Sequence, residues 1–100
     1  MIEKNEITDN IKANIALGGM NSLNTYIVRN IITGGRCEGI FIVEGGDCWI
    51  THNTISENND GIVCMSSVPE ITKNEINKNK SNGIYLKIKL SLNYIRYYVN

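Results

Sequence analysis

A six-residue pattern, Ile-x-x-Asn-x-Ile, occurs four times in this chain at nearly constant spacing. The copies begin at residues 2, 27, 50 and 71, so their starts are 25, 23 and 21 residues apart. Each copy continues alike, with Asn or Gly three residues on and an apolar-x-apolar triplet four or five residues after that. A chain with such a repeat is expected to stack equivalent units on one another.

The apolar spacing within one copy indicates short strands joined by corners. Ile15 and Leu17 are two residues apart, which places both on one face of a strand. Ile50 and Ile55 are five apart, so the chain must turn between them, at Asn53. We predict that Asn53 itself adopts the left-handed corner conformation, which Asn tolerates well. Three strands, three corners and one apolar lining make one coil of a parallel β-helix.

We therefore predict an all-β solenoid of about four coils with a mean length of 23 residues. The coils are expected at residues 2–24, 25–48, 49–69 and 70–93, with an irregular C-terminal strand or cap at 87–100. The alternation from Leu86 to Tyr94 predicts one long amphipathic strand. This strand either closes the helix or leads into further coils, so the chain is a single β-helix domain or a fragment of one.

Two other repeat folds fit less well. A leucine-rich repeat has a period of 20 to 29 residues but requires Leu where this motif has Asn. Helical repeats need some 10 to 12 continuous residues with a 3.6-residue period. Asn, Gly and Thr interrupt every such window in this chain.

The motif copies, and above all PEITKNEINKNKSNGIYL at residues 69–86, resemble the parallel β-helix repeat family. That family includes pectate-lyase-like enzymes, periplasmic copper-accessory proteins of the NosD type and the β-helix regions of F-box proteins. The resemblance covers residues 2–86 and implies a right-handed, single-stranded, pectin-lyase-like fold. It implies no single function, because the family contains both catalysts and binding scaffolds.

Stacked coils place equivalent residues in columns about 4.8 Å apart. Four inner columns are predicted: Ile2/Ile27/Ile50/Ile71, Ile7/Ile32/Ile55/Ile76, Ile15/Ile40/Ile62/Ile84 and Leu17/Ile42/Cys64/Leu86. A structural ladder of side-chain amides is predicted for the motif asparagines, Asn5, Asn30, Asn53 and Asn74.

Two sets of residues are candidates for surface binding. The residues that precede the ladder asparagines are basic or imidazole side chains: Lys4, Arg29, His52 and Lys73. Like charges so close repel, and an anionic partner would relieve that repulsion; the alternative is a solvated corner that discourages association of strand edges. Trp49 is either a stacking platform for sugar or a packed corner residue.

No catalytic set is recognisable. Asp9, Asp47 and Asp60 fall in three different columns, which gives no paired carboxylates in neighbouring coils. Glu6 and Glu75 share a column but lie three coils apart, about 14 Å by stacking. A glycosidase pair needs about 5–9.5 Å.

Composition excludes other classes of function. The formal net charge is zero, so no overall field attracts nucleic acid, and no apolar run reaches the ~18 residues of a membrane span. The cysteines, Cys37, Cys48 and Cys64, have no close ligand spacing and would hold a metal with His52 only if the fold gathered them. We predict no metal and no cofactor. Unpaired thiols and an N-terminus without a signal-peptide pattern favour an intracellular location.

The sequence thus favours a non-catalytic β-helix scaffold for protein or carbohydrate recognition. The alternative is a fragment of a polysaccharide lyase or hydrolase whose catalytic coils lie outside this chain. Self-association is expected, where it occurs, to use the coil ends or strand edges.

Overall fold

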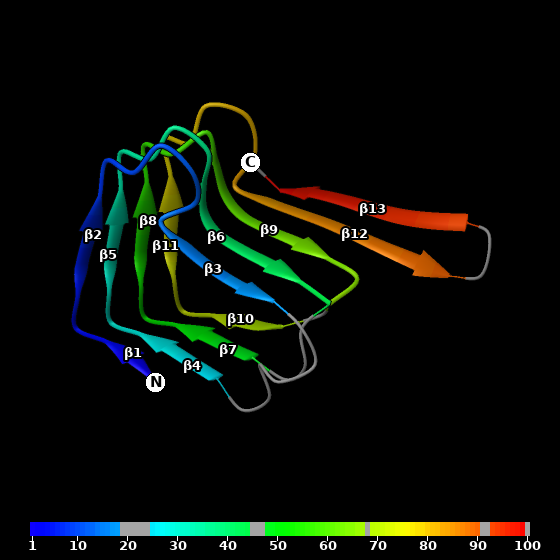
Figure 1. Ribbon diagram of the computed structural model, residues 1–100, viewed down its shortest axis with the longest axis horizontal. Helices are drawn as coiled ribbons and strands as arrows, with labels where there is room; N and C mark the ends of the chain where they lie inside the picture. Colours follow the sequence, from blue (N-terminus) through cyan, green and yellow to red (C-terminus); the bar gives the residue numbers. More distant parts are fainter. Residues whose placement is uncertain (19–24, 45–47, 68, 91–92, 100) are drawn as a thin grey trace.

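The computed structural model is a β-solenoid in which three sheets, parallel apart from the last strand of one of them, form three sides around one core (Figure 1). It describes residues 1–18, 25–44, 48–67, 69–90 and 93–99, with side chains only up to residue 87. No helix occurs within those ranges, and hence none with the length and apolar character of a membrane span.

Each coil contributes one strand to each sheet. Sheet A contains β1 (Ile2–Glu3), β4 (Thr25–Val28), β7 (Cys48–Thr51) and β10 (Glu70–Thr72). Sheet B contains β2 (Glu6–Thr8), β5 (Ile31–Thr33), β8 (Thr54–Ser56) and β11 (Glu75–Asn77). Sheet C contains β3 (Ile15–Gly18), β6 (Glu38–Val43), β9 (Asp60–Met65), β12 (Ile84–Leu90) and β13 (Asn93–Val99). The all-β solenoid predicted from the repeat is confirmed.

The strands pair in the register that the repeat predicts. Ile27 pairs with Ile2 on one side and Ile50 on the other, and Ile50 pairs with Ile71. The same one-to-one pairing holds in sheets B and C, so all four inner columns form. A slip of one residue would turn every inner side chain to solvent, which is why the alternation fixes the register.

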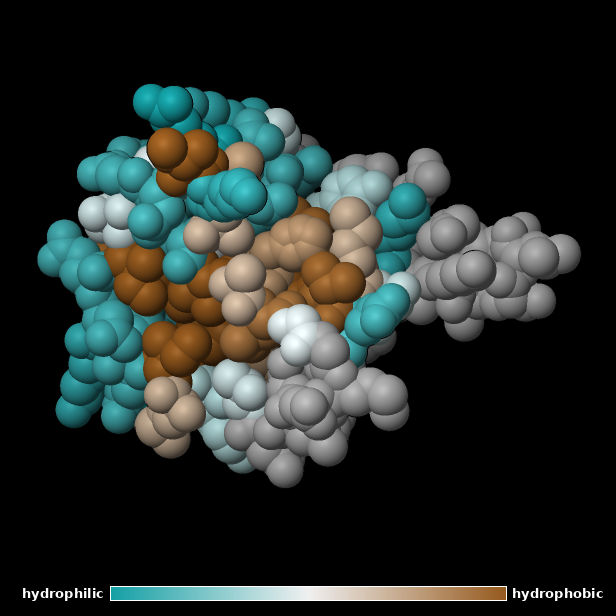
Figure 2. Space-filling view, viewed as in Figure 1, coloured by the Kyte–Doolittle hydropathy of each residue, from teal (hydrophilic) through white to brown (hydrophobic). Residues whose placement is uncertain are grey.

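The core is a stack of branched aliphatic side chains. The hydrophobic residues with no exposed surface in the described ranges are Ile27, Ile32, Ile40, Ile42, Ile50, Ile55, Ile62 and Cys64. Each such isoleucine contributes about 1.5–3 kcal/mol from burial. At the first coil Ile2, Ile7 and Leu17 pack against this core but stay partly exposed. Apolar side chains gather in the middle of the face shown in Figure 2, inside the outline of the three sheets.

The corners differ from the sequence prediction in one respect. The left-handed conformation belongs to the residue before each ladder asparagine, with φ of 57° at Arg29 and 59° at His52, and not to Asn30 or Asn53. The left-handed residue turns the chain, and the asparagine that follows is buried at 1–2% exposure, where its amide reaches the neighbouring coils. The prediction that Asn53 supplies the left-handed corner is therefore wrong.

The C-terminal end also differs from the prediction. β12 pairs in parallel with β9 up to Lys87, and β13 then adds antiparallel to β12, with Ile84 opposite Val99 and Leu90 opposite Asn93. The predicted single strand from Leu86 to Tyr94 is wrong, because the chain reverses between Leu90 and Asn93. β13 adds a strand to sheet C alone, and Figure 1 shows the β12–β13 pair extending away from the coils.

Candidate functional site

The outer surface of sheet A displays two columns of side chains. Because alternate residues of a strand face opposite ways, Ile27 and Ile50 point inward while their neighbours point outward. One outer column contains Glu3, Val28, Thr51 and Thr72, and the other contains Tyr26, Trp49 and Glu70. Hydroxyl, aromatic and carboxylate groups therefore share this surface.

A basic column runs along the corner beside sheet A, made of Lys4, Arg29, His52 and Lys73. All four residues are exposed, and all four have the left-handed backbone, with φ between 54° and 59°. The backbone N–H of His52 donates to the carbonyl of Lys73 at 3.1 Å, and that of Arg29 to the carbonyl of Thr51 at 3.3 Å. The first bond joins two members of the column on adjacent coils, and the second joins Arg29 to the residue before His52.

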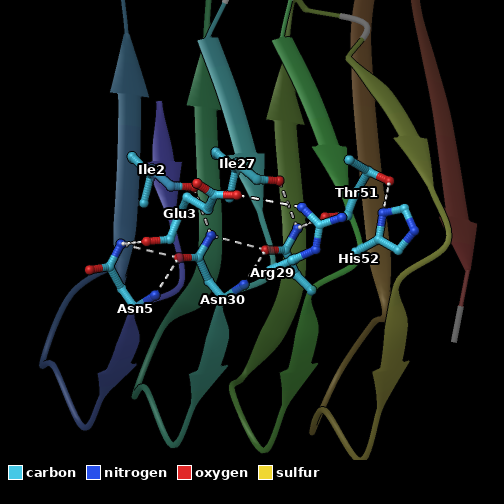
Figure 3. A network of polar contacts seen from close by, with 9 residues as sticks. Ile2, Glu3, Asn5, Ile27, Arg29, Asn30, Thr51 and His52 are labelled. Atoms are coloured by element: carbon cyan, nitrogen blue, oxygen red, sulfur yellow. Dashed lines mark hydrogen bonds and ion pairs between the residues drawn. The ribbon is translucent and has the colours of Figure 1, made fainter.

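Only one member of the basic column forms an ion pair within the described ranges. Arg29 Nη1 lies 3.5 Å from Glu3 Oε2, with the two side chains 56% and 35% exposed (Figure 3). Such an exposed pair contributes at most about 1 kcal/mol. In the part of the chain that the structure describes, Lys4 and Lys73 have no carboxylate partner.

A short chain of hydrogen bonds orients His52. Thr72 Oγ1 donates to Thr51 Oγ1 at 3.3 Å, and Thr51 Oγ1 lies 2.8 Å from His52 Nδ1 (Figure 3). Thr51 Oγ1 can donate to Nδ1 or accept from it, and in either case the contact holds the ring with Nε2 facing away from Thr51.

Trp49 stacks on Tyr26 of the preceding coil. The ring centroids are 4.7 Å apart and the ring planes differ by 10°. Trp49 is half-buried, and Tyr26 is 39% exposed. Because one face of the indole is covered by the phenol, a sugar cannot stack on that face.

The motif asparagines form a continuous ladder through the corner. Asn53 Oδ1 accepts hydrogen bonds from the backbone N–H of Asn30 at 2.9 Å and from Asn30 Nδ2 at 3.0 Å. Asn53 Nδ2 in turn donates to Asn74 Oδ1 at 3.0 Å and to the Ile27 carbonyl at 2.9 Å. Asn5 makes the same bonds to Asn30 (Figure 3). Asn30 and Asn53 thus each tie their coil to both neighbours.

A second ladder at the next corner contains an exchange that the sequence analysis missed. Its members are Asn58 and Asn79, but the second coil has Gly35 in their place. Asn14 of the first coil fills the gap: its Nδ2 donates to Asn58 Oδ1 at 2.9 Å, and its Oδ1 accepts from Asn10 Nδ2 at 2.8 Å. Asn14 therefore supplies the amide that the second coil lacks.

The exchange has a steric reason. In the later coils the residue before the first inward isoleucine of sheet C is glycine, and a Cβ at Gly39 would lie 2.9 Å from Asn58 Nδ2 and 2.7 Å from the Gly61 carbonyl. In the first coil this position holds Asn14, which fits because Gly35 has no side chain. The signal was present in the sequence as an Asn where other copies have Gly, and a Gly where they have Asn.

The remaining chemical candidates do not assemble into a site. Cys48 and Cys64 are buried in the core, while Cys37 contacts the Ile11 carbonyl at a corner and His52 is exposed at another. Over the described ranges, no group of three or more His, Cys, Asp or Glu side chains is placed to hold a metal ion.

Burial makes the two core thiols poor nucleophiles. It raises the pKa of Cys48 to about 11. The pKa of Cys64 rises to about 12, chiefly through burial, with repulsion from Cys48 adding to the effect and the Ser67 hydroxyl opposing it. The Ser67 oxygen is itself buried and forms no hydrogen bond of ordinary geometry with the described residues. Both cysteines therefore act as small apolar core residues.

The carboxylates are also dispersed. Glu6 and Glu75 lie in the outermost strands of sheet B, with Ile31 and Thr54 between them. Asp60, the first residue of β9, accepts hydrogen bonds from the backbone and side chain of Asn82. Asp47 lies outside the described residues.

Sequence reasoning also missed an apolar groove of about 540 Å³ on the outer surface of sheet C. Ala16 and Gly18 of β3 lie opposite Phe41 and Val43 of β6, and small residues beside large ones leave the hollow. The signal was again in the sequence, as the two small outward residues that flank Leu17.

The geometry defines a parallel β-solenoid with an amide-laddered corner and a basic column along one edge. Residues 1–96 match the family described as a right-handed β-helix region, so the chain belongs to that family and its coils wind right-handed. No curated protein and no solved structure matches the chain at a significant level.

Proposed function

We propose that this chain is a non-catalytic recognition scaffold that binds an acidic polysaccharide along the basic column beside sheet A. The observation that carries the proposal is the register of Lys4, Arg29, His52 and Lys73: four exposed nitrogen-bearing side chains repeat once per coil on one corner. A polymer with one carboxylate per sugar repeats its charge in the same way. Repeated complementary charges favour binding even though the chain has no net charge.

The surface next to the column supports a sugar polymer. Thr51 and Thr72 carry hydroxyl groups on the outer surface of sheet A, and the imidazole of His52, held by Thr51, presents its Nε2 away from that hydroxyl. Trp49 and Tyr26, stacked on each other, belong to the same outer surface of sheet A. Sugar hydroxyls would bond to the threonines and the imidazole while the carboxylates contact the cations.

Binding of polygalacturonate, measured by isothermal titration calorimetry at low ionic strength, tests the proposal. The variant Lys4→Gln/Arg29→Gln/Lys73→Gln removes three charges from the column. Each exposed contact contributes up to about 1 kcal/mol, so affinity is expected to fall by about 10-fold or more. The matched control, Arg36→Gln/Lys78→Gln/Lys80→Gln, removes three exposed charges elsewhere and should change affinity by less than about 2-fold.

Three results would contradict the proposal. Equal losses of affinity in the column variant and the control would show that the polymer is attracted by charge without a defined site. Absence of binding at low salt would exclude acidic polysaccharides as the ligand. Release of unsaturated products from the polymer would make the chain a lyase and overturn its non-catalytic role.

A further inference from the structure

One column of polar side chains at the start of sheet C changes from acid to amide along the solenoid. Glu38 pairs with Asp60 in the next coil, and the register places Asn82 beside Asp60 in the coil after that. Asp60 Oδ1 accepts a hydrogen bond from the backbone N–H of Asn82 at 3.1 Å and another from Asn82 Nδ2 at 3.3 Å. The contact therefore depends on Asn82 presenting a donor where a carboxylate would be repelled.

The side-chain amide of Asn82 is held less firmly than the amides of the ladder. Asn53 is 2% exposed, its Oδ1 accepts two hydrogen bonds and its Nδ2 donates to three oxygens. Asn82 is half-buried, and among the residues that the structure describes its Nδ2 has one partner and its Oδ1 has none. The amide carbon of Asn82 is thus freer to turn toward a nucleophile.

The residue after Asn82 supplies that nucleophile. Asn82 is the one asparagine of the chain that is followed by glycine. Gly83 has no Cβ, so its backbone nitrogen can approach the preceding side chain without a clash. In the equivalent pair one coil earlier, Asp60–Gly61, the N–H of Gly61 donates to the Asn82 carbonyl at 2.9 Å, which holds that nitrogen in the stack.

We propose that Asn82 is a site of spontaneous deamidation, and that the product loosens the fourth coil from the third. The backbone nitrogen of Gly83 attacks Cγ of Asn82, and a bond forms between them. The bond from Cγ to Nδ2 breaks, and Nδ2 leaves as ammonia with the proton that the Gly83 nitrogen loses. Water then opens the five-membered succinimide at one of its two carbonyls, which gives aspartate or isoaspartate at position 82.

Both products disturb the junction between β9 and β12. A carboxylate oxygen replaces Nδ2 beside Asp60, so a hydrogen bond is lost and two negative charges face each other, with Glu38 next in the column. Isoaspartate also adds a methylene to the backbone. This displaces the carbonyls at positions 82 and 83, which accept hydrogen bonds from the N–H groups of Gly61 and Ile62 at 2.9 and 2.8 Å.

Incubation of the folded full chain at mildly alkaline pH, followed by peptide mapping with mass spectrometry, tests the reaction. Conversion at Asn82 should be about 10-fold or more faster than at the ladder residue Asn53. Asn82→Gln should abolish the fast conversion, because its additional methylene requires a larger ring. The matched control is Asn77→Gln, which changes an exposed asparagine that precedes lysine and should leave the conversion at Asn82 unchanged.

Urea unfolding of freshly prepared variants tests the consequence. Asn82→Asp should lower the urea midpoint by about 0.5–1 M. The double variant Asp60→Asn/Asn82→Asp exchanges donor and acceptor and should restore the midpoint. Conversion no faster at Asn82 than at Asn53 would overturn the modification site. An unchanged midpoint in Asn82→Asp, or no recovery in the double variant, would overturn the effect on the junction between the coils.

Discussion

The ladder corners depend on the chemistry of one short amide side chain. Asn53 presents one acceptor oxygen to Asn30 and a nitrogen within 3.1 Å of three oxygens, those of Ile27, Thr51 and Asn74. Aspartate has no donor, and glutamine has an additional methylene in a fully packed corner. The left-handed backbone of the preceding residue costs roughly 1–2 kcal/mol. The buried amide bonds offset that cost, since each contributes about 1 kcal/mol.

The exchanged pair Asn14 and Gly35 permits a double-mutant test. Asn14→Gly removes bonds to Asn58 and Asn10 and should cost about 1–3 kcal/mol in the free energy of unfolding. Gly35→Asn forces a Cβ to 2.9 Å from Asn14 Nδ2 and should cost a similar amount. The double variant recreates the arrangement of Gly39 and Asn58 and is expected to return near the original stability. Urea unfolding measures all four proteins.

A coupling energy of about 2 kcal/mol or more is expected between the two changes. Simple addition of the two losses would show that Asn14 does not substitute for the missing ladder amide.

The buried thiols predict how stability depends on pH. Burial raises the pKa of Cys64 from its ordinary value of 9.0 to about 12 and that of Cys48 to about 11. Below pH 9 the thiols are protonated in both folded and unfolded chains, so their contribution is fully present. Between pH 9 and 11 only the unfolded chain ionises, and stability should fall by about 1.4 kcal/mol per pH unit for each thiol.

Urea unfolding at pH 8, 9, 10 and 10.5 measures this slope. Cys64→Val keeps an apolar residue between Ile42 and Leu86 and should have a shallower slope. An unchanged slope in that variant would assign the pH dependence to other groups.

At the scale of the strand, the length of the last strand explains why sheet C has an additional strand paired with its edge. The last strands of sheets A and B, β10 and β11, have three residues each, whereas β12 has seven. Short edges are poor templates for pairing with another chain, and long ones invite association. β13 pairs with β12 along its whole length, from Ile84 to Leu90.

Removal of residues 91–100 is therefore expected to cause association. The seven-residue edge of β12 becomes free, and the chain should form dimers or larger species that grow with concentration. Size-exclusion chromatography with light scattering compares the truncated and full chains over the same concentrations. A truncated chain that stays as monomeric as the full one would show that β13 does not protect this edge.

The elements show what the repeat could and could not predict. The spacing of the apolar residues was sufficient to predict the inner columns. Apolar residues alternate within each strand and the alternation breaks once at each corner, so only one register between coils is possible. The same spacing misplaced the left-handed residue, since a corner of two residues allows either to carry the positive φ, and propensity favours Asn. It also missed the reversal before β13, because a long strand and a hairpin have the same alternation.

At the scale of the molecule, stability is a sum over coils and their interfaces. Deletion of residues 50–70 removes the third coil and joins Trp49 to Ile71, which keeps every inner column in register. This variant should fold, with reduced cooperativity and a lower midpoint in urea. Deletion of residues 50–69 retains one extra residue, Glu70, and reverses the facing of the strand that follows the junction.

Far-UV circular dichroism and urea unfolding separate the two deletions. The 21-residue deletion should keep a β spectrum and a sigmoidal transition, and the 20-residue deletion should lose both. Equal behaviour would contradict the view that register between coils determines the fold.

The candidate surfaces were only partly predictable. The basic column follows from the repeat, because Lys4, Arg29, His52 and Lys73 occupy one position of the motif. The stacking of Trp49 on Tyr26 depends on a neighbour 23 residues away, which the aligned repeats place opposite but do not orient. The groove beside β3 can be predicted only by comparing the sizes of side chains in successive coils. The pattern of polar and apolar residues does not indicate it.

The pairing of Trp49 with Tyr26 has a practical consequence. Trp49 is the sole tryptophan of the chain, and its partner ring belongs to the coil beneath. Its emission therefore reports on one junction between coils, while circular dichroism averages over all of them. Unfolding that starts in another coil would not change the emission of Trp49 until the contact between Trp49 and Tyr26 opens.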